Sequence, residues 1–326
     1  MWKIDNIEIN SKVVLAPMAG VTSFGYRKFM EKFGAEVTYT EMISDMGLIY
    51  GNDETNSYID FPKHNSIIGA QLFGHDPSCL SQAAQIIIKK NKNIDFIDIN
   101  MGCPVLKVTK TGAGSALLKD PKLCGDIVRE IRKVTNLPIT AKIRLGWDIS
   151  SINYLSVINE LEKAGISAIA IHARTKSELY TGLPHFNLLK DIRKQMHVPL
   201  IISGNIYTLD DAINAINITG ADAVMVARGA MGNPFLIKQI NTYFQTGERL
   251  SSPSLRVQLD YCLDLANYLI EEKGEKKAMS IYRSIAPKFI IGIPNAKEFK
   301  SRLASQLVDR KSLVDILNEI KENYCS

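Results

Sequence analysis

Short apolar segments alternate with longer amphipathic stretches along most of the chain. The apolar segments are rich in β-branched residues, as buried strands are, and lie at 13–16, 36–40, 67–72, 96–100, 139–143, 168–172, 200–203 and 223–227. The stretches between them carry apolar residues at helical spacing, as in Cys124, Ile127, Val128 and Ile131. Strand followed by helix, repeated eight times, predicts a (β/α)8 TIM barrel.

The pattern changes after Glu248, where the strand signal stops. Amphipathic helices are predicted at 255–273, 278–290 and 296–323, broken by Gly274, Gly292 and Pro294. We therefore predict an α/β chain with a barrel domain at 1–245 and a small C-terminal helical domain at 246–326. A doubly wound sheet is disfavoured, because no early G-x-G-x-x-G opens a helix and polar residues follow many strands instead of one switch point.

Composition narrows the class of protein. The 326 residues are 46% hydrophobic and 22% charged, which suits a chain with a full core. The five cysteines form no C-x-x-C pair, so we expect neither a disulfide framework nor a metal site. The charged start and the absence of a long apolar run predict a cytoplasmic protein without a membrane segment. The net charge of +5 permits a polyanionic partner without requiring one.

Polar side chains gather where the predicted strands end, and in a TIM barrel catalytic groups lie at those ends. Any one of them could be an ordinary loop residue, but the set is too polar for eight accidental loop starts. The residues at these strand ends are Pro17, Met18, Glu41, Gln71, Asn100, Cys103, Lys142, Arg144, His172, Arg174, 203–205, Arg228 and Gly229.

Two glycine turns follow strands seven and eight, where barrels commonly hold a phosphate. They are Ser203-Gly204-Asn205 and Ala227-Arg228-Gly229. Backbone N–H groups and the Arg228 guanidinium suit a phosphorylated ligand there. The alternative is a pair of tight turns without a ligand.

Gln71, Lys142 and His172 end strands three, five and six, so all three are expected to point into the mouth of the barrel. Together they could hold a flat polar ring, and a cation beside a flavin stabilises its reduced, anionic form. Lys142 could also be a surface lysine or a Schiff-base nucleophile. Cys103 follows strand four on a loop and is the best candidate for an acid, although a lone cysteine is by default a small buried hydrophobe.

Taken together, these stretches resemble the tRNA-dihydrouridine synthase family, of the bacterial, FMN-dependent type. The resemblance covers nearly the whole barrel and rests on Leu15 to Thr22, Gln71-Leu72-Phe73-Gly74, Asp98 to Pro104 with Lys107-Val108, Gly112 to Leu118, Lys142-Ile143-Arg144, His172-Ala173-Arg174-Thr175, Tyr180-Thr181-Gly182, Ala227 to Ala230 and Gly232-Asn233-Pro234. It implies that NADPH reduces FMN, and that the flavin passes a hydride to C6 of a uracil in tRNA. Cys103 matches the family's proton donor to C5.

The resemblance also assigns ligand contacts. Those expected for FMN are Pro17, Met18, Ala19, Gln71, Lys142, His172, Ser203, Gly204, Asn205, Ala227, Arg228 and Gly229. Those expected for tRNA are Asn100, Lys107, Arg144 and Arg174. Two positions depart from the family pattern: Ser203-Gly204-Asn205 stands where Asn-Gly-Asp or Asn-Gly-Gly is expected, and Glu178 stands where an arginine-like residue is frequent.

The helical domain is expected to bind the tRNA backbone. Residues 249–326 hold 13 basic and 10 acidic side chains, and a basic stretch comprises Lys276, Lys277, Arg283, Lys288, Lys297, Lys300 and Arg302. Two other functions stay open: a flavin-dependent reductase or dehydrogenase of a free pyrimidine, similar to dihydroorotate dehydrogenase, and a tRNA-binding or chaperone protein whose chemistry is dispensable. Nothing in the sequence assigns a protein partner, an oligomeric state or the uridine that is modified.

Overall fold

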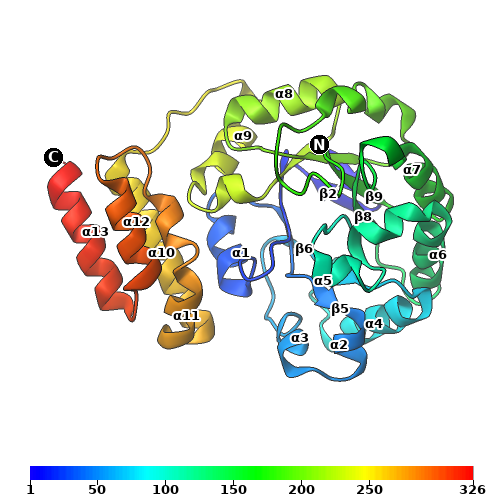
Figure 1. Cartoon of the computed structure of the whole chain (residues 1–326), viewed down its shortest axis with the longest axis horizontal. Coiled ribbons are helices and arrows are strands. Elements are labelled where there is room, and N and C mark those ends of the chain that lie inside the picture. Colours follow the sequence, from blue (N-terminus) through cyan, green and yellow to red (C-terminus); the bar gives the residue numbers. More distant parts are fainter. Residues whose placement is uncertain (326) are drawn as a thin grey trace.

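The computed structural model describes residues 1–325, and within them eight parallel strands close into a barrel surrounded by helices (Figure 1). The strands are β3 (Val13–Leu15), β4 (Val37–Tyr39), β6 (Ile67–Phe73), β7 (Phe96–Met101), β8 (Ile139–Arg144), β9 (Ala168–His172), β10 (Leu200–Ser203) and β11 (Ala223–Val226). The barrel closes because β11 pairs with β3 and β4 pairs with β6. The prediction of a TIM barrel is confirmed, and each predicted strand is found.

Helices follow most strands and cover the outside of the barrel. They are α1 (Phe24–Glu31), α2 (Asp45–Ile49), α3 (Asp53–Ser57), α4 (Pro77–Lys90), α5 (Leu106–Thr109), α6 (Pro121–Arg132), α7 (Tyr154–Lys163), α8 (Leu209–Thr219) and α9 (Phe235–Thr246). Two of them begin in the same way, because Asp76 and Asp120 accept a backbone N–H as N-caps and a proline follows each.

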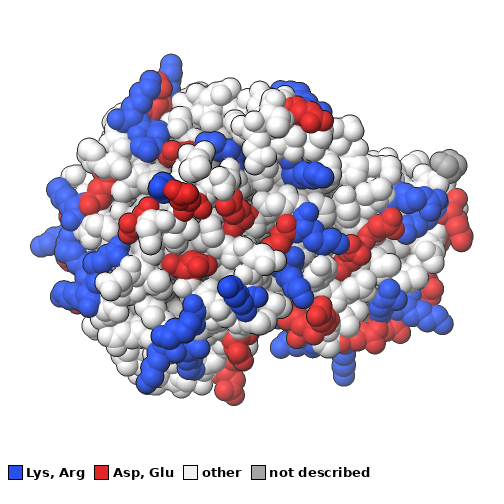
Figure 2. Space-filling view, turned by 180° about the vertical axis from the view of Figure 1, so that it is seen from behind, with Lys and Arg blue, Asp and Glu red and all other residues white. Residues whose placement is uncertain are grey.

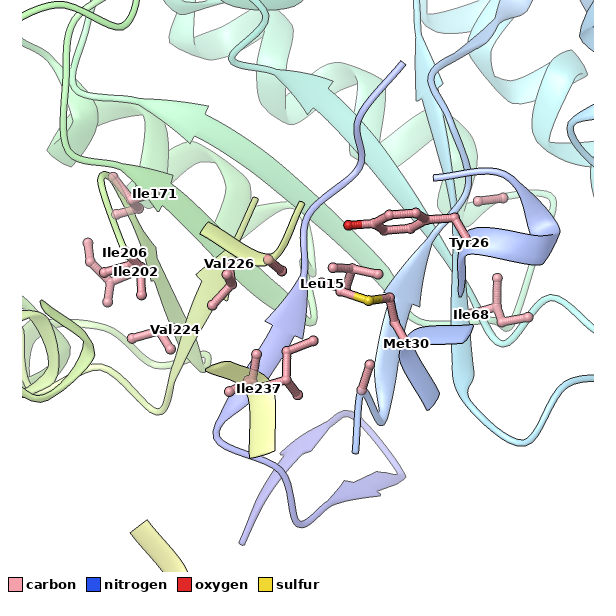
Figure 3. Close-up of a cluster of buried hydrophobic side chains, with 14 of the residues drawn as sticks. Leu15, Tyr26, Met30, Ile68, Ile171, Ile202, Ile206, Val224, Val226 and Ile237 are labelled. Carbon is pink, nitrogen blue, oxygen red and sulfur yellow. The ribbon is translucent and has the colours of Figure 1, made fainter. Parts of the chain in front are cut away.

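Alternation along the strands separates two hydrophobic layers. Residues such as Ile97, Ile99 and Ile171 point outward and pack under the helices, with Ile131 of α6 among their neighbours in one large cluster. Figure 3 shows Leu15 of this layer between Val226 and two side chains of α1. The inward positions near the start of the strands form a separate cluster. Neighbouring residues of one strand therefore serve two cores.

A hairpin that the sequence analysis missed lies against the end of the barrel where the strands begin. Strand β1 (Trp2–Ile4) pairs antiparallel with β2 (Ile7–Ile9), and Trp2, Ile4 and Ile9 join the inward cluster. The Trp2 indole also donates a hydrogen bond to the carbonyl of Ser11. This hairpin fills the N-terminal end of the barrel interior with apolar side chains, so space for a ligand remains only at the other end.

The inward positions near the end of the strands are polar instead. Asp98 of β7 lies in register between Gln71 of β6 and Thr140 of β8, and Asn100 lies beside Lys142. Period-two alternation sends these side chains to one side of the sheet, while Ile99, Ala141 and Ile143 face the helices. The barrel therefore has an apolar half and a polar half.

The C-terminal region is helical, and two details differ from the prediction. Its helices are α10 (Leu255–Lys273), α11 (Glu275–Tyr282), α12 (Ala296–Ser305) and α13 (Arg310–Tyr324). The single helix predicted at 296–323 is wrong: Asp309 forms a capping box with Ser312 and starts a new helix there. The helix predicted at 278–290 is also wrong in its bounds, because a short 3-10 turn covers Ala286–Phe289. The division into two domains at 245 and 246 stays a prediction.

Candidate active site

One pocket of about 410 Å³ lies at the polar end of the barrel, a size typical of small-molecule sites. The predicted FMN contacts all line it: Pro17, Met18, Ala19, Gln71, Lys142, His172, Ser203, Gly204, Asn205, Ala227, Arg228 and Gly229. Cys103, Asn100 and Arg144 line it too, whereas Lys107 and Arg174 do not. The fold therefore gathers residues from seven separate strand ends around one cavity.

A chain of hydrogen bonds connects the floor of this pocket to the cysteine loop. Asp98 accepts from Thr140 and from Gln71 Nε2, at 2.5 and 2.6 Å. Gln71 Oε1 accepts from Asn100 Nδ2 at 2.9 Å, and Asn100 Oδ1 accepts the backbone N–H of Cys103 at 2.8 Å. Because each amide is held at both its oxygen and its nitrogen, every hydrogen bond of the chain donates in one direction, from Cys103 toward Asp98.

Lys142 is the cation at the floor of the pocket. Burial lowers its pKa to about 8, helped by the nearby Arg144 guanidinium and opposed by the Asp98 carboxylate. Among residues 1–325 no side chain forms an ion pair or hydrogen bond with its ammonium group. Burial in turn raises the pKa of Asp98 to about 6, although its hydrogen bonds from Gln71 and Thr140 oppose the rise. An anionic ligand beside Lys142 would raise the pKa of this ammonium group again.

His172 enters the pocket as a neutral imidazole. Burial lowers its pKa well below the ordinary value, and the charges of Lys142 and Arg144 add to the effect. Arg174 Nη1 lies 3.1 Å from His172 Nε2. A guanidinium only donates, so Nε2 accepts and the ring proton sits on Nδ1. His172 therefore presents an N–H donor rather than a charge.

Two glycine turns form the opposite wall. Gly229 leaves no room for a side chain, because a Cβ there would collide with the carbonyl of Ile206 in the neighbouring turn. Gly204 has φ +138, which other residues rarely adopt. The Arg228 guanidinium lies 3.5 Å from Asn205 Oδ1 and stacks near the rings of Tyr180 and Tyr207. These turns bring backbone and one guanidinium together as a phosphate site requires.

Cys103 is a half-buried free thiol on the loop after β7. Burial raises its pKa above the ordinary value, with only partial opposition from a backbone hydrogen bond and the charge of Arg144. The carbonyl of Cys103 accepts from the backbone and the hydroxyl of Ser115, at 3.1 and 2.9 Å. The thiol is thus protonated at neutral pH, and the backbone of Cys103 is held by hydrogen bonds at both its N–H and its carbonyl.

The two arginines predicted to contact substrate use most of their N–H donors in hydrogen bonds within the protein. Arg144 donates to the carbonyls of Gly102, Thr175 and Leu179. Arg174 donates to Thr181 and Gly182, and both guanidiniums are fully buried. Arg144, at the end of β8, holds the loop after β9 against the barrel, and Arg174 connects two parts of that loop. A contact of either arginine with substrate stays a prediction.

Glu178, one of the departures from the family pattern, has an internal role in the same loop. Its carboxylate accepts from the backbone and the hydroxyl of Thr175, at 2.7 and 2.8 Å, and lies 2.6 Å from His185 Nε2. Those hydrogen bonds lower the pKa of Glu178, although burial opposes them. The residue therefore stabilises the fold of the loop.

Several residues in the pocket or directly beneath it received no role from the sequence. Tyr180 and Tyr207 line the mouth, and each ring lies about 5 to 6 Å from the Arg228 guanidinium. Asp98 anchors the hydrogen-bond chain. Each had a recognisable signal, namely an aromatic residue in a loop after a strand, or a carboxylate in an otherwise apolar strand. Met42 and Met231 complete the apolar lining without such a signal.

Comparison with known proteins identifies the family of this chain. The family model described as dihydrouridine synthase matches residues 14–324. The chain belongs to the dihydrouridine synthase family. A probable tRNA-dihydrouridine synthase of Rickettsia bellii is 33% identical over 92% of each chain. The tRNA-dihydrouridine synthase B of Pseudomonas aeruginosa is 32% identical over 92% of this chain and 90% of its own. The family predicted from the sequence is confirmed.

Solved structures support the architecture. The old yellow enzyme homologue from Zymomonas mobilis superposes with a TM-score of 0.50 and 14% identity, over 76% of this chain and 92% of that one. At this identity the likeness concerns the fold alone. Among residues 1–325, no helix is long and apolar enough to cross a membrane, and no three His, Cys, Asp or Glu side chains gather as a metal site.

Proposed function

We propose that this protein is an FMN-dependent tRNA-dihydrouridine synthase, which reduces the C5=C6 bond of specific uridines in tRNA with NADPH as electron source. The observation that carries the proposal is one cavity that holds a cationic floor at Lys142, a glycine-turn wall at Arg228 and a protonated thiol at Cys103. Family membership supplies the reaction to which these groups correspond. The reducing cytoplasm suits its free thiols.

The pocket residues fit FMN. The turns at 203–205 and 227–229 would hold the phosphate, since Gly229 allows the two backbones to approach and Arg228 adds charge. Lys142, Gln71 and His172 would hold the ring, because they offer an ammonium, an amide and a neutral N–H donor on one floor. When bound, FMN would supply the hydride that adds to C6 of the uracil.

Cys103 completes the reduction by giving the S–H proton to C5, so that one hydride and one proton add across the double bond. The thiolate that remains regains a proton from solvent. Raising the thiol pKa keeps the acid protonated before the step. Asn100 orients Cys103 through its backbone N–H, and the hydrogen-bond chain to Asp98 fixes Asn100.

A uracil within folded tRNA has to leave its stack to reach this pocket, and contacts with the rest of the tRNA supply that energy. The helical region, with its excess of basic residues, is our candidate for these contacts, together with Lys107, Arg144 and Arg174. On the face drawn in Figure 2, basic and acidic side chains are interspersed over the helices and the barrel. A tRNA that contacts this face would therefore be bound by individual side chains rather than by one broad basic surface.

Dihydrouridine formation tests the proposal directly. Transfer RNA from a dihydrouridine-deficient strain is incubated with the protein, FMN and NADPH, and its nucleosides are analysed by mass spectrometry. We expect dihydrouridine with the parent protein and a loss of about 100-fold or more in rate with Cys103→Ala, since a general acid contributes on that order. Cys79→Ala, on helix α4, is the matched control and retains the parental rate.

Other outcomes decide against the proposal. A protein that binds FMN and oxidises NADPH yet leaves folded tRNA unchanged is a reductase of a free pyrimidine. A protein that binds tRNA but no flavin has the RNA-binding function without the chemistry. Equal rates for Cys103→Ala and Cys79→Ala would show that Cys103 is not the proton donor.

A further inference from the structure

A second cavity, of about 300 Å³, lies between the barrel and the helical region. Helix α1, the segment 57–61 and the ends of α10 and α11 line it. It shares a wall with the active-site pocket. Val21 and Met42 line the active-site pocket, whereas their neighbours in sequence, Thr22 and Glu41, line this cavity.

Arg27 is the feature of this cavity that requires a partner. Its side chain is 2% exposed and makes one hydrogen bond, from Nη1 to the carbonyl of Thr22 at 2.8 Å. Nε and Nη2 are buried and have no hydrogen-bond partner among residues 1–325. Leaving charged donors unsatisfied in the interior is expensive, so they mark a place that water or a ligand completes.

Carboxylates limit what that ligand can be. Glu41, Glu272 and Asp60 line the same cavity. Glu272 is engaged with Ser23 and the N–H of Gly25, but Glu41 uses only Oε2, toward the N–H of Gly20. Lys273, which also lines the cavity, is paired with Glu272 at 2.8 Å. Beside Arg27, a phosphate or carboxylate would be repelled by the Glu41 carboxylate, and a cation would be repelled by Arg27 itself. The cavity therefore suits a neutral ligand with acceptors on one edge and donors on the next.

We propose that this cavity binds a guanine base of the same tRNA, displaced from its stack near the uridine that is reduced. Guanine is the base that offers O6 and N7 as paired acceptors to Arg27, together with N1–H and N2–H as donors to Glu41. The inference rests on the proposed function for the source of the base. It assigns to this chain a second nucleotide site, which would recognise the identity of one base of the tRNA. Reduction of the uracil in the first pocket does not itself require such recognition.

The surrounding walls suit a base with its phosphate. Phe61 stacks with Phe24 at 6.4 Å between ring centroids and lies beneath the Arg27 guanidinium at 4.7 Å, so flat surfaces line the inner side. Lys277, exposed at the rim on α11, is available for a phosphate. The helical region thereby contributes to a site in which the proposed base contacts, Arg27 and Glu41, belong to the barrel.

Base analogues test the site with the unaltered holoenzyme. Each guanine near the mapped uridine is replaced singly by 7-deazaguanine, which lacks the N7 acceptor, or by inosine, which lacks the N2 donor. We expect one position at which each analogue weakens tRNA binding about tenfold, as for a lost bidentate contact. NADPH oxidation by the holoenzyme, measured without tRNA, serves as the reference that its flavin site is intact. If every guanine tolerates both analogues, the inference is wrong.

Variants assign the contact to Arg27. Arg27→Met should weaken binding of unmodified tRNA about tenfold. In this variant, replacing guanine by 7-deazaguanine should cause no further loss of binding. In Lys28→Met, on the same helix, 7-deazaguanine should weaken binding as it does in the parent protein. A phosphate contact would instead give a loss with Arg27→Met that no base analogue reproduces, and would overturn the proposal. So would competition by guanosine monophosphate at low concentration, which would mark a free-nucleotide site.

These binding measurements are separate from turnover. If tRNA shows the guanine effect but no dihydrouridine forms, the guanine site stands and the reductase proposal fails. If dihydrouridine forms and the guanines are neutral, the reductase stands and the guanine site is refuted.

Discussion

Cys103 illustrates how one residue is prepared by its surroundings. Burial raises its pKa above the ordinary 9.0, and the thiol is therefore the dominant form across the physiological range. Lys142 shows the opposite response to the same burial, with a pKa of about 8, because desolvation disfavours a charge of either sign. One dry pocket thus keeps an acid protonated and leaves a cation ready for an anionic partner.

The sign of the Cys103 shift predicts the pH dependence of the protonation step. The active form is the thiol, which is present below its pKa and is lost only as pH rises through the raised value. With enzyme reduced beforehand, the single-turnover rate of dihydrouridine formation should stay constant from pH 7 to about 9 and fall above it. Quenched-flow sampling measures this rate. A decline centred below pH 8 would show that another group is the acid.

Sequence patterns located these residues but did not describe how each is used. Gln71, Lys142 and His172 could be placed because strand ends of a barrel face one mouth. The roles of Arg144 and Arg174 could not, because their partners are carbonyls of a loop whose path depends on tertiary contacts. Side-chain type predicts a group's chemistry but not which neighbour satisfies it.

At the scale of elements, the loop after β9 is rigid because three buried or half-buried groups hold its backbone. Arg144 and Arg174 bind four of its carbonyls, and Glu178 binds Thr175 within the loop. The loop carries Tyr180 to the mouth of the pocket. Its shape is therefore set by Arg144 of the barrel together with contacts of Arg174 and Glu178 within the loop.

Arg174→Leu should release this loop. The substitution leaves the carbonyls of Thr181 and Gly182 without their donors, and we expect a loss of about 2 kcal/mol in the free energy of unfolding. Hydrogen exchange should accelerate in peptides covering 175–182, whereas Arg129→Leu, on the surface of α6, leaves exchange there unchanged. Unaltered exchange with Arg174→Leu would contradict this account.

The elements that the sequence predicted best are those with a one-sided burial pattern. Every barrel strand was found because each combines apolar outward positions with a turn at its end. Strand β5 (Ile43–Ser44) was missed because it has only two residues. The hairpin strands were missed because each places a charged residue between two apolar ones and so forms no continuous apolar segment. The helix at 296–323 was predicted as one because its apolar spacing continues across the break, although the cap at Asp309 was visible in the sequence.

At the scale of the whole molecule, α10 joins the helical region to the barrel by packing on α1, which is visible in Figure 1. Gly25 of α1 permits this contact, because a Cβ there would lie 2.6 Å from the carbonyl oxygen of Tyr268. Glu272 then accepts from the backbone N–H of Gly25 and from the hydroxyl of Ser23, at 2.8 and 2.7 Å. The same packing forms the roof of the second cavity, so the relative position of the two regions determines whether a tRNA can contact both.

Gly25→Ala tests whether this close packing positions the helical region. In an isolated helix the substitution would stabilise by about 1 kcal/mol, but here the added methyl meets backbone, and we expect destabilisation of about 1–3 kcal/mol instead. Affinity for tRNA should fall while NADPH oxidation, which needs only the barrel pocket, is retained. Lys32→Ala, which removes a half-exposed ion pair with Asp264 across the same contact, changes stability by less than about 1 kcal/mol. Urea unfolding and tRNA binding measure both variants, and a more stable Gly25→Ala protein would show that α10 can move away freely.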